Sequence, residues 1–158
     1  MPIKHGGTNA QDIVTARANL GFLAKLWSNT DRNDNGEFVA FGESSDLFKE
    51  IAIENIDDYK GIFIVYRLRR TLSTKVTQFI PLEIGGTGTS SSDVENAIVT
   101  YGFVNTASGD NSYLVRRYCY ATKTGVVFGR GGKKNAITDT SWDVDNNYMI
   151  PEYIYGIA

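Results

Sequence analysis

The chain has 158 residues, enough for one domain with a real core, because chains of this length bury roughly two-thirds of their unfolded surface. With 42% hydrophobic and 12% aromatic residues, it is too apolar for disorder or a fibrous repeat along its whole length. The formal net charge of -2 offers no field that would attract a phosphate backbone, so the composition argues against a nucleic-acid partner.

Residues 6–21 carry the signals of one short helix. Thr8 is a suitable N-cap, and Gly21 supplies the left-handed residue that ends many helices. A narrow stripe of mostly small apolar side chains follows one face: Ile13, Ala16 and Leu20. A helix of about three turns is marginal alone. We therefore expect the stripe to pack against the chain's own sheet, or against the same stripe of two other subunits around an axis.

From Phe22 onward the pattern changes to strands. Short apolar or alternating runs between turn residues predict strands at 23–27, 37–41, 47–53, 61–68, 75–84, 97–104, 113–121, 125–129 and 148–157. The run around Ile64 is almost continuously apolar, which is typical of a central strand covered on both faces. The fold class we expect is mainly β, an antiparallel β-sandwich or jelly roll. We expect residues 23–158 to form this β domain, which we call the head domain. Residues 1–22 would precede it as a junction segment that contains the short helix.

Two clusters near the N-terminus resemble a motif of phage tail fibres and related tailocins. The chain has Pro2-Ile3, then Gly6-Gly7-Thr8-Asn9, then Ala16-Arg17-Ala18-Asn19-Leu20-Gly21. The family motif has Gly where this chain has Asn9, a residue that also tolerates left-handed backbone. The terminal Tyr155-Gly156-Ile157 is similar, more weakly, to the end of many fibre and baseplate head domains. The main resemblance covers about the first 22 residues of the chain.

The resemblance implies the distal, receptor-binding domain of a tail fibre, acting as a homotrimer with Ile13, Ala16 and Leu20 near the threefold axis. It implies two further kinds of partner: the rest of the tail fibre or baseplate, and a bacterial surface polysaccharide or anionic polymer such as teichoic acid. Such proteins are made in the host cytoplasm, act in the virion tail and are commonly the ends of longer chains. The alternative is a structural tip or baseplate subunit that trimerises without touching a receptor.

Other features argue against an enzyme, a cofactor or a resident metal. Cys119 is the only cysteine, so it has no intrachain disulfide partner, and we expect it to be a small buried residue. His5 is the only histidine, and no pair of carboxylates stands out for glycosidase chemistry. No run approaches the roughly 20 apolar residues that span a bilayer, and residues 1–10 lack a signal-peptide pattern. We therefore predict no membrane insertion and an exit from the cell with the particle or by lysis.

The segment Asp31 to Gly36 matches the first half of a calcium loop, whose alternating oxygens suit a hard cation. The rest of the segment does not match a calcium loop, because Gly42 occupies the position of the bidentate carboxylate. The sequences on either side are also predicted to be strands and not helices. A solvated hairpin turn is the better interpretation.

The segment 139–148 is the main candidate for a sugar contact. Its carboxylates are Asp139, Asp143 and Asp145. The contact residues that we expect in it are Trp142, Asp143, Asn146, Asn147 and Tyr148. Ring faces stack on sugars, while carboxylate and amide groups bond to hydroxyls. The alternative is a surface loop whose Trp142 packs into the core.

The segment 129–134 is the candidate for an anionic polymer. It lacks the Gly and the Ser or Thr that a phosphate-binding Walker loop requires, so we interpret it as a basic hairpin tip. Arg130 and Lys133 would contact the polymer there through charge-assisted hydrogen bonds.

Overall fold

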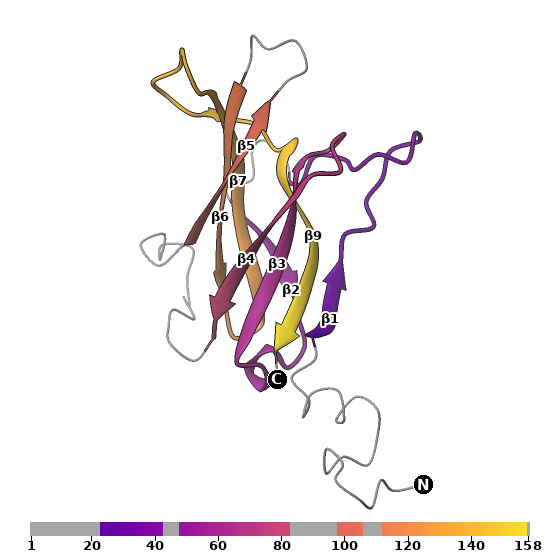
Figure 1. The fold of residues 1–158 in the computed structure, drawn as a ribbon. Coiled ribbons are helices and arrows are strands. Elements are labelled where there is room, and N and C mark those ends of the chain that lie inside the picture. Colours follow the sequence, from indigo (N-terminus) through magenta and orange to yellow (C-terminus); the bar gives the residue numbers. More distant parts are fainter. Residues whose placement is uncertain (1–22, 43–47, 83–97, 106–111, 158) are drawn as a thin grey trace, which may run out of the picture.

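The structure is a computed structural model that describes residues 23–42, 48–82, 98–105 and 112–157. Within these ranges the chain is mainly β, with one short 3-10 turn, η1, at Ile56–Asp58. The strands are β1 (Leu23–Ser28), β2 (Phe48–Ala52), β3 (Gly61–Arg69), β4 (Lys75–Pro81), β5 (Ile98–Asn105), β6 (Ser112–Ala121), β7 (Gly125–Asn135), β8 (Asp143–Val144) and β9 (Tyr148–Ile157). They form two antiparallel sheets packed as a sandwich (Figure 1). One sheet has the order β1-β9-β3-β4, and the other has the order β2-β7-β6-β5 with β8 beside β7.

The core lies between the two sheets, and β3 shows how the sequence builds it. Ile62, Ile64 and Tyr66 are buried, while Phe63 and Val65 between them are half-buried on the outer face. β3 pairs with β4 on one side and β9 on the other, which confirms the prediction of a central strand. The expectation that both faces are covered is wrong. Successive side chains point to opposite faces, and only one of them meets the second sheet.

The facing sheet contributes small and aromatic core residues: Val115, Cys119, Val126 and Phe128. Cys119 is fully buried, as predicted, and burial raises the pKa of its thiol to about 11. The Tyr66 hydroxyl donates to Gln78 Oε1 at 3.0 Å, and the Cys119 sulfur lies 3.2 Å from both groups. A small polar cluster therefore bridges the two sheets inside the core.

An arginine also lies in this core. Arg117 is 1% exposed, and its guanidinium donates to four backbone carbonyl oxygens: those of Phe41, Gly129, Tyr148 and Met149. The shortest of these bonds run from Nε to Met149, at 2.6 Å, and from Nη1 to Gly129, at 2.7 Å. Burial lowers the pKa of Arg117 to about 10, which leaves the group charged at neutral pH. Arg117 therefore ties the segment before β2, strand β7 and the start of β9 together.

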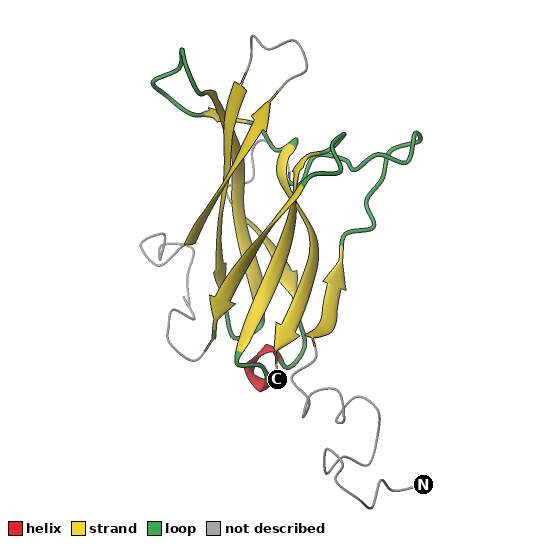
Figure 2. Cartoon of the chain, in the orientation of Figure 1, coloured by secondary structure: helices red, strands yellow, loops and turns green. Residues whose placement is uncertain are grey.

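The two ends of the described chain meet in one sheet, because β9 lies between β1 and β3 and Leu23 pairs with Ile157. At the opposite end of the sandwich from Ile157, long loops project beyond the strands, including residues 29–42 and 136–142 (Figure 2). The described part of the chain contains no helix that is long and apolar enough to cross a membrane.

Two predictions of local structure are wrong. In the segment 37–41, predicted as a strand, only Phe38 pairs, through an isolated bridge to Arg32, because this segment instead places Phe38 and Phe41 in the core. The segment 129–134 is no hairpin tip, since β7 continues through it to Asn135 between β6 and β8. The other predicted strands are present with small shifts at their ends. The predicted helix at 6–21 lies outside the described residues.

Candidate functional site

A groove lies on the outer face of the five-stranded sheet, and we call it the aromatic groove. It has a volume of about 230 Å³ and is lined by Phe48, Arg116, Tyr118, Gly129, Arg130, Gly131, Gly132, Trp142, Asp143 and Val144. The alternation along β6 explains its position: Val115 and Arg117 are buried in the core, so Arg116 and Tyr118 point outward.

Glycines of β7 leave room for these outward side chains. A Cβ on Gly132 would lie 3.3 Å from Arg116 Cγ, and one on Gly129 would lie 3.2 Å from Tyr118 Cβ. Both distances are tighter than ordinary van der Waals contacts between carbon atoms. Because β7 carries glycine at these positions, Arg116 and Tyr118 can lie close to its backbone, which forms part of the floor of the groove.

Arg116 packs against two aromatic rings of the groove. Its Cζ lies 4.2 Å from the centroid of the Trp142 ring and 5.1 Å from that of the Tyr118 ring. Lys134 Nζ lies 5.5 Å from the Trp142 centroid, and the Tyr101 ring packs against Trp142 at a centroid distance of 6.0 Å. Trp142 is half-buried by these contacts on the outside of the sheet. It therefore neither projects freely into solvent nor packs into the core.

The structure brings three of the predicted contact residues together in this groove: Trp142, Asp143 and Arg130. Lys133 is not part of the groove lining, although it pairs across the strands with Asp143 of β8 as well as with Val115 of β6. Its Nζ makes a 3.0 Å ion pair with Asp145. The hydrogen bond to Asp145 raises the pKa of Lys133. From the sequence, the segments 139–148 and 129–134 are predicted to form two separate sites. In the structure both segments contribute to one groove, and Lys133 is not part of its lining.

Tyr148 and Asn146 hold the chain in place. Tyr148 is 5% exposed, and its carbonyl oxygen is one of the acceptors of Arg117. Asn146 is 8% exposed; its Oδ1 accepts from the Gly131 N–H at 2.7 Å, and its Nδ2 donates to the Gly42 carbonyl at 3.2 Å. Both residues are buried in the described structure, and the Asn146 amide bonds to the backbone on two sides, so we count neither as a contact residue of the aromatic groove.

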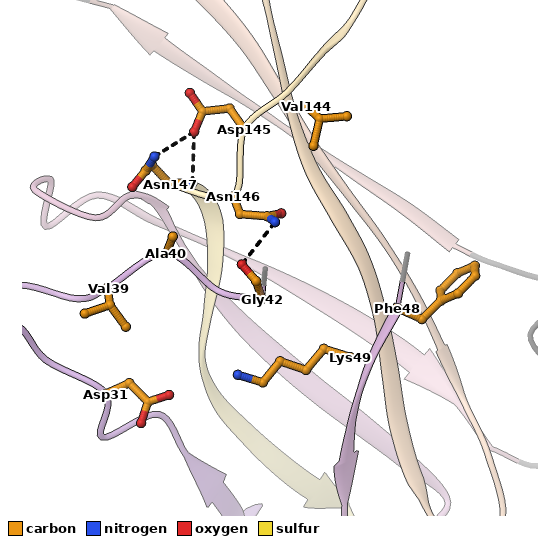
Figure 3. Close-up of a pocket in the computed structure, with 10 residues that line it drawn as sticks. All are labelled: Asp31, Val39, Ala40, Gly42, Phe48, Lys49, Val144, Asp145, Asn146 and Asn147. Carbon is orange, nitrogen blue, oxygen red and sulfur yellow. Dashed lines mark hydrogen bonds between the residues drawn. The ribbon is translucent and has the colours of Figure 1, made fainter. Parts of the chain in front are cut away.

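A second and larger hollow, the polar hollow, shares Phe48 and Val144 with the aromatic groove. It measures about 720 Å³ and is lined by Asp31, Val39, Ala40, Gly42, Phe48, Lys49, Val144, Asp145, Asn146 and Asn147 (Figure 3). The predicted contact Asn147 lies here, and it donates to Asp145 Oδ1 from its backbone N–H at 3.0 Å and from Nδ2 at 2.9 Å. Figure 3 shows Lys49 extending into the hollow, where its Nζ lies 4.5 Å from the Phe41 ring centroid.

Asp145, Asn146 and Asn147 of the polar hollow bond to one another, to Lys133 or to the backbone. Burial would raise the pKa of the Asp145 carboxyl, but hydrogen bonds from Lys133 and Asn147 outweigh burial and lower it. Gly42 and Phe48, which both line the hollow, flank residues 43–47, and that part of the chain lies outside the described residues. The aromatic groove combines three aromatic rings with two arginines that make no ion pair within the described residues, and we therefore take it as the candidate site.

The segment Asp31 to Gly36 forms the predicted hairpin turn. Asn33 Oδ1 accepts from the N–H groups of Asn35, at 3.1 Å, and Glu37, at 2.9 Å. Gly36 has the positive φ of 77° that favours glycine. The Asn33 oxygen thus closes the turn instead of facing outward as a ligand. Across the described ranges, no group of three or more His, Cys, Asp or Glu side chains is placed to hold a metal ion.

The sequence analysis missed three lining residues, namely Arg116, Tyr118 and Phe48. The alternation of β6 does carry a signal, because the adjacent Arg116 and Arg117 must point to opposite faces of the sheet. The pattern alone does not say which arginine faces the core. That depends on the carbonyl oxygens that surround Arg117, which come from distant parts of the chain.

Comparison of the chain with models of known protein families, with curated proteins and with solved structures finds no match. The fold and the site define an antiparallel β-sandwich with an aromatic, arginine-lined groove on the outer face of one sheet. The function is therefore argued from this groove and from the N-terminal motif.

Proposed function

We propose that this chain is the distal, non-enzymatic domain of a phage-type tail fibre and that it attaches the particle to a bacterial surface glycan. The N-terminal motif supports the assignment to a fibre. Several connections cross from one sheet to the other, namely β1 to β2, β2 to β3, β4 to β5 and β8 to β9, which suits the jelly-roll form of such head domains. The proposal includes a homotrimer, with the junction helix at 6–21 and the contacts Ile13, Ala16 and Leu20 on its axis. The rest of the fibre or baseplate would precede this junction in the virion tail.

The observation that carries the proposal is the aromatic groove. Trp142, Tyr118 and Phe48 supply ring surfaces, while Arg116 and Asp143 supply polar groups beside them. Sugar rings expose apolar C–H faces and polar edges, so they need this combination of surfaces in one shallow site. Arg116, Tyr118 and Phe48 lie on paired strands, which hold them in fixed positions, and Trp142 immediately precedes β8.

A shallow groove is sufficient for adsorption because the sites act together. A trimer would carry three grooves, and a particle carries several fibres, so a repeating polymer engages many sites at once. Linked sites of this kind raise the effective affinity by roughly two to four orders of magnitude without any new contact. A weak single site is therefore compatible with firm attachment of a particle.

The proposal predicts that the isolated chain binds bacterial surface glycans through Trp142. The measurement is binding of the labelled chain to printed bacterial polysaccharides and to a panel of bacterial cells, before and after Trp142→Ala. Loss of the ring should cost about 1–3 kcal/mol per site, and adsorption to cells should fall more steeply because several sites act at once.

The matched control is Ile137→Ala, since Ile137 lies in the loop before Trp142 and is 79% exposed but does not line the groove. It should bind like the parent chain, and both variants should keep the parent's circular dichroism and oligomeric state. A parent chain that binds neither cells nor glycans would overturn the proposal. The structural tip or baseplate subunit would then be the better function.

A further inference from the structure

We infer that the aromatic groove recognises an acidic sugar unit, one that carries a carboxylate or a phosphate, and that Arg116 binds the anion. The inference rests on the proposed function and names its ligand class. It also assigns a contact residue that lies outside both segments singled out in the sequence.

The first argument is the way in which Arg116 is held. Its guanidinium packs against the Trp142 and Tyr118 rings at 4.2 and 5.1 Å, and cation–π contacts of this kind leave the N–H groups at its edge unused. Within the described residues, Arg116 makes no ion pair and no side-chain hydrogen bond. A planar fork that is already held in place binds a carboxylate or phosphate in a bidentate manner with little loss of side-chain freedom.

The second argument is the charge around the groove. Arg116 and Arg130 both line it, and Lys134 lies beside Trp142, whereas Asp143 is the only carboxylate in the lining. The ion pairs of the described residues involve Arg67, Lys75 and Lys133, so neither groove arginine forms an ion pair there, and one carboxylate, Asp143, faces two arginines in the lining. An anion in the groove would supply the missing negative charge in a partly desolvated place, where charge pairs are screened less than at the open surface.

The third argument is the shape and remaining surface of the groove. Its volume of about 230 Å³ is below the roughly 300 Å³ at which sites for drug-sized ligands begin, so it suits one sugar unit of a polymer. Phe48 and Val144 add apolar surface to the wall of the groove. An acidic sugar unit thus satisfies the arginines and the apolar wall together, which neither a neutral sugar nor a bare anion does.

The experiment compares three polymer probes with the full chain: dextran, polygalacturonate and a phosphomannan, which carry neutral, carboxylated and phosphorylated sugar units. The expected result is that at least one acidic polymer binds about tenfold or more tightly than dextran, with affinity that falls as salt is added. The polygalacturonate and phosphomannan arms separate a carboxylate ligand from a phosphate ligand. Equal binding of dextran and both acidic polymers would overturn the inference.

Variants then locate the anion. Arg116→Gln should weaken binding of the acidic polymer about tenfold, and Arg116→Lys should weaken it nearly as much because an ammonium lacks the planar fork. Arg70→Gln removes the same charge from an exposed residue after β3, outside the groove lining, and should change binding less than about twofold. An Arg70→Gln effect as large as that of Arg116→Gln would show general charge attraction and would overturn the assignment.

The two proposals fail in different ways. If Trp142→Ala abolishes glycan binding but Arg116→Gln leaves it unchanged, the proposed function stands. The inference that the ligand is an acidic sugar is then wrong. Failure of the parent chain to bind any of the probes, printed glycans or cells would overturn both.

Discussion

Arg117 and Arg116 are neighbours in sequence with opposite environments. Arg117 is buried and donates to four carbonyl oxygens, whereas Arg116 lies against two rings on the outer face of the sheet. The pleat of β6 explains the difference, because adjacent residues of a strand point to opposite faces. The same residue type thus stabilises the fold at one position and lines the candidate site at the next.

We predict that Arg117→Leu destabilises the protein strongly. The leucine would fill part of the space, but it would leave buried carbonyl oxygens of Gly129, Tyr148 and Met149 without their donor. Breaking a buried charged network of this kind costs about 3–5 kcal/mol. The free energy of unfolding in urea is the measurement. Arg116→Leu is the matched control and should change that free energy by less than about 1 kcal/mol; similar losses in the two variants would contradict this account of the core.

At the scale of the element, β3 is an interior strand of the four-stranded sheet. It has hydrogen-bonded neighbours on both sides, and its inward residues meet those of β6 and β7. Its sequence was recognised as a strand because the apolar run is continuous and rich in β-branched and aromatic residues. The run could not reveal that the outer residues Phe63 and Val65 are only half-buried, since apolar side chains occur on both faces.

Ile64 provides the test of this element, because its side chain is fully buried. Ile64→Asp would place a carboxylate without a partner in the core, and we expect a loss of several kcal/mol with little folded protein. Thermal unfolding and solubility measure the effect. Thr77→Asp on the neighbouring β4 is the control, because Thr77 pairs with Val65 and is exposed. A soluble, fully folded Ile64→Asp variant would show that the proposed core is wrong.

At the scale of the whole molecule, the loops 29–42 and 136–142 project at one end of the sandwich, and the C-terminal end of β9 lies at the other (Figure 1). The aromatic groove lies on an outer sheet face near the 136–142 loop. This arrangement suits a domain that is held at one end and contacts a surface elsewhere, as the proposed fibre tip requires. The proposed trimer contacts lie in residues 1–22, outside the described part of the chain.

We predict a homotrimer with a mass of about three times 17.5 kDa by light scattering. Leu20→Asp would place a charge within the apolar stripe and should dissociate the trimer, while the sandwich keeps its circular dichroism. Asn19→Asp introduces the same side chain one position away from the stripe and should remain trimeric. A parent chain that is monomeric at micromolar concentration would remove the main support for a fibre.

The sequence by itself determined the mainly β class and most of the strands. Apolar alternation, aromatic content and turn residues are local signals, and each strand carries enough of them to be recognised. The burial of Cys119 and the hairpin turn at Asp31 to Gly36 were predictable for the same reason. The loop with Trp142 and the segment with Arg130 were also recognised as candidates, although as two separate sites.

Only the tertiary structure decided which side chains meet. The groove joins residues of β2, β6, β7 and β8, and its composition depends on strand order and register. Lys133 lies three positions after Arg130 on β7, so their side chains point to opposite faces of the sheet, and the strand order decides which of these faces meets the core. Whether a polar side chain faces a ligand or holds the fold depends on partners far away in sequence, and the local pattern contains no information about them.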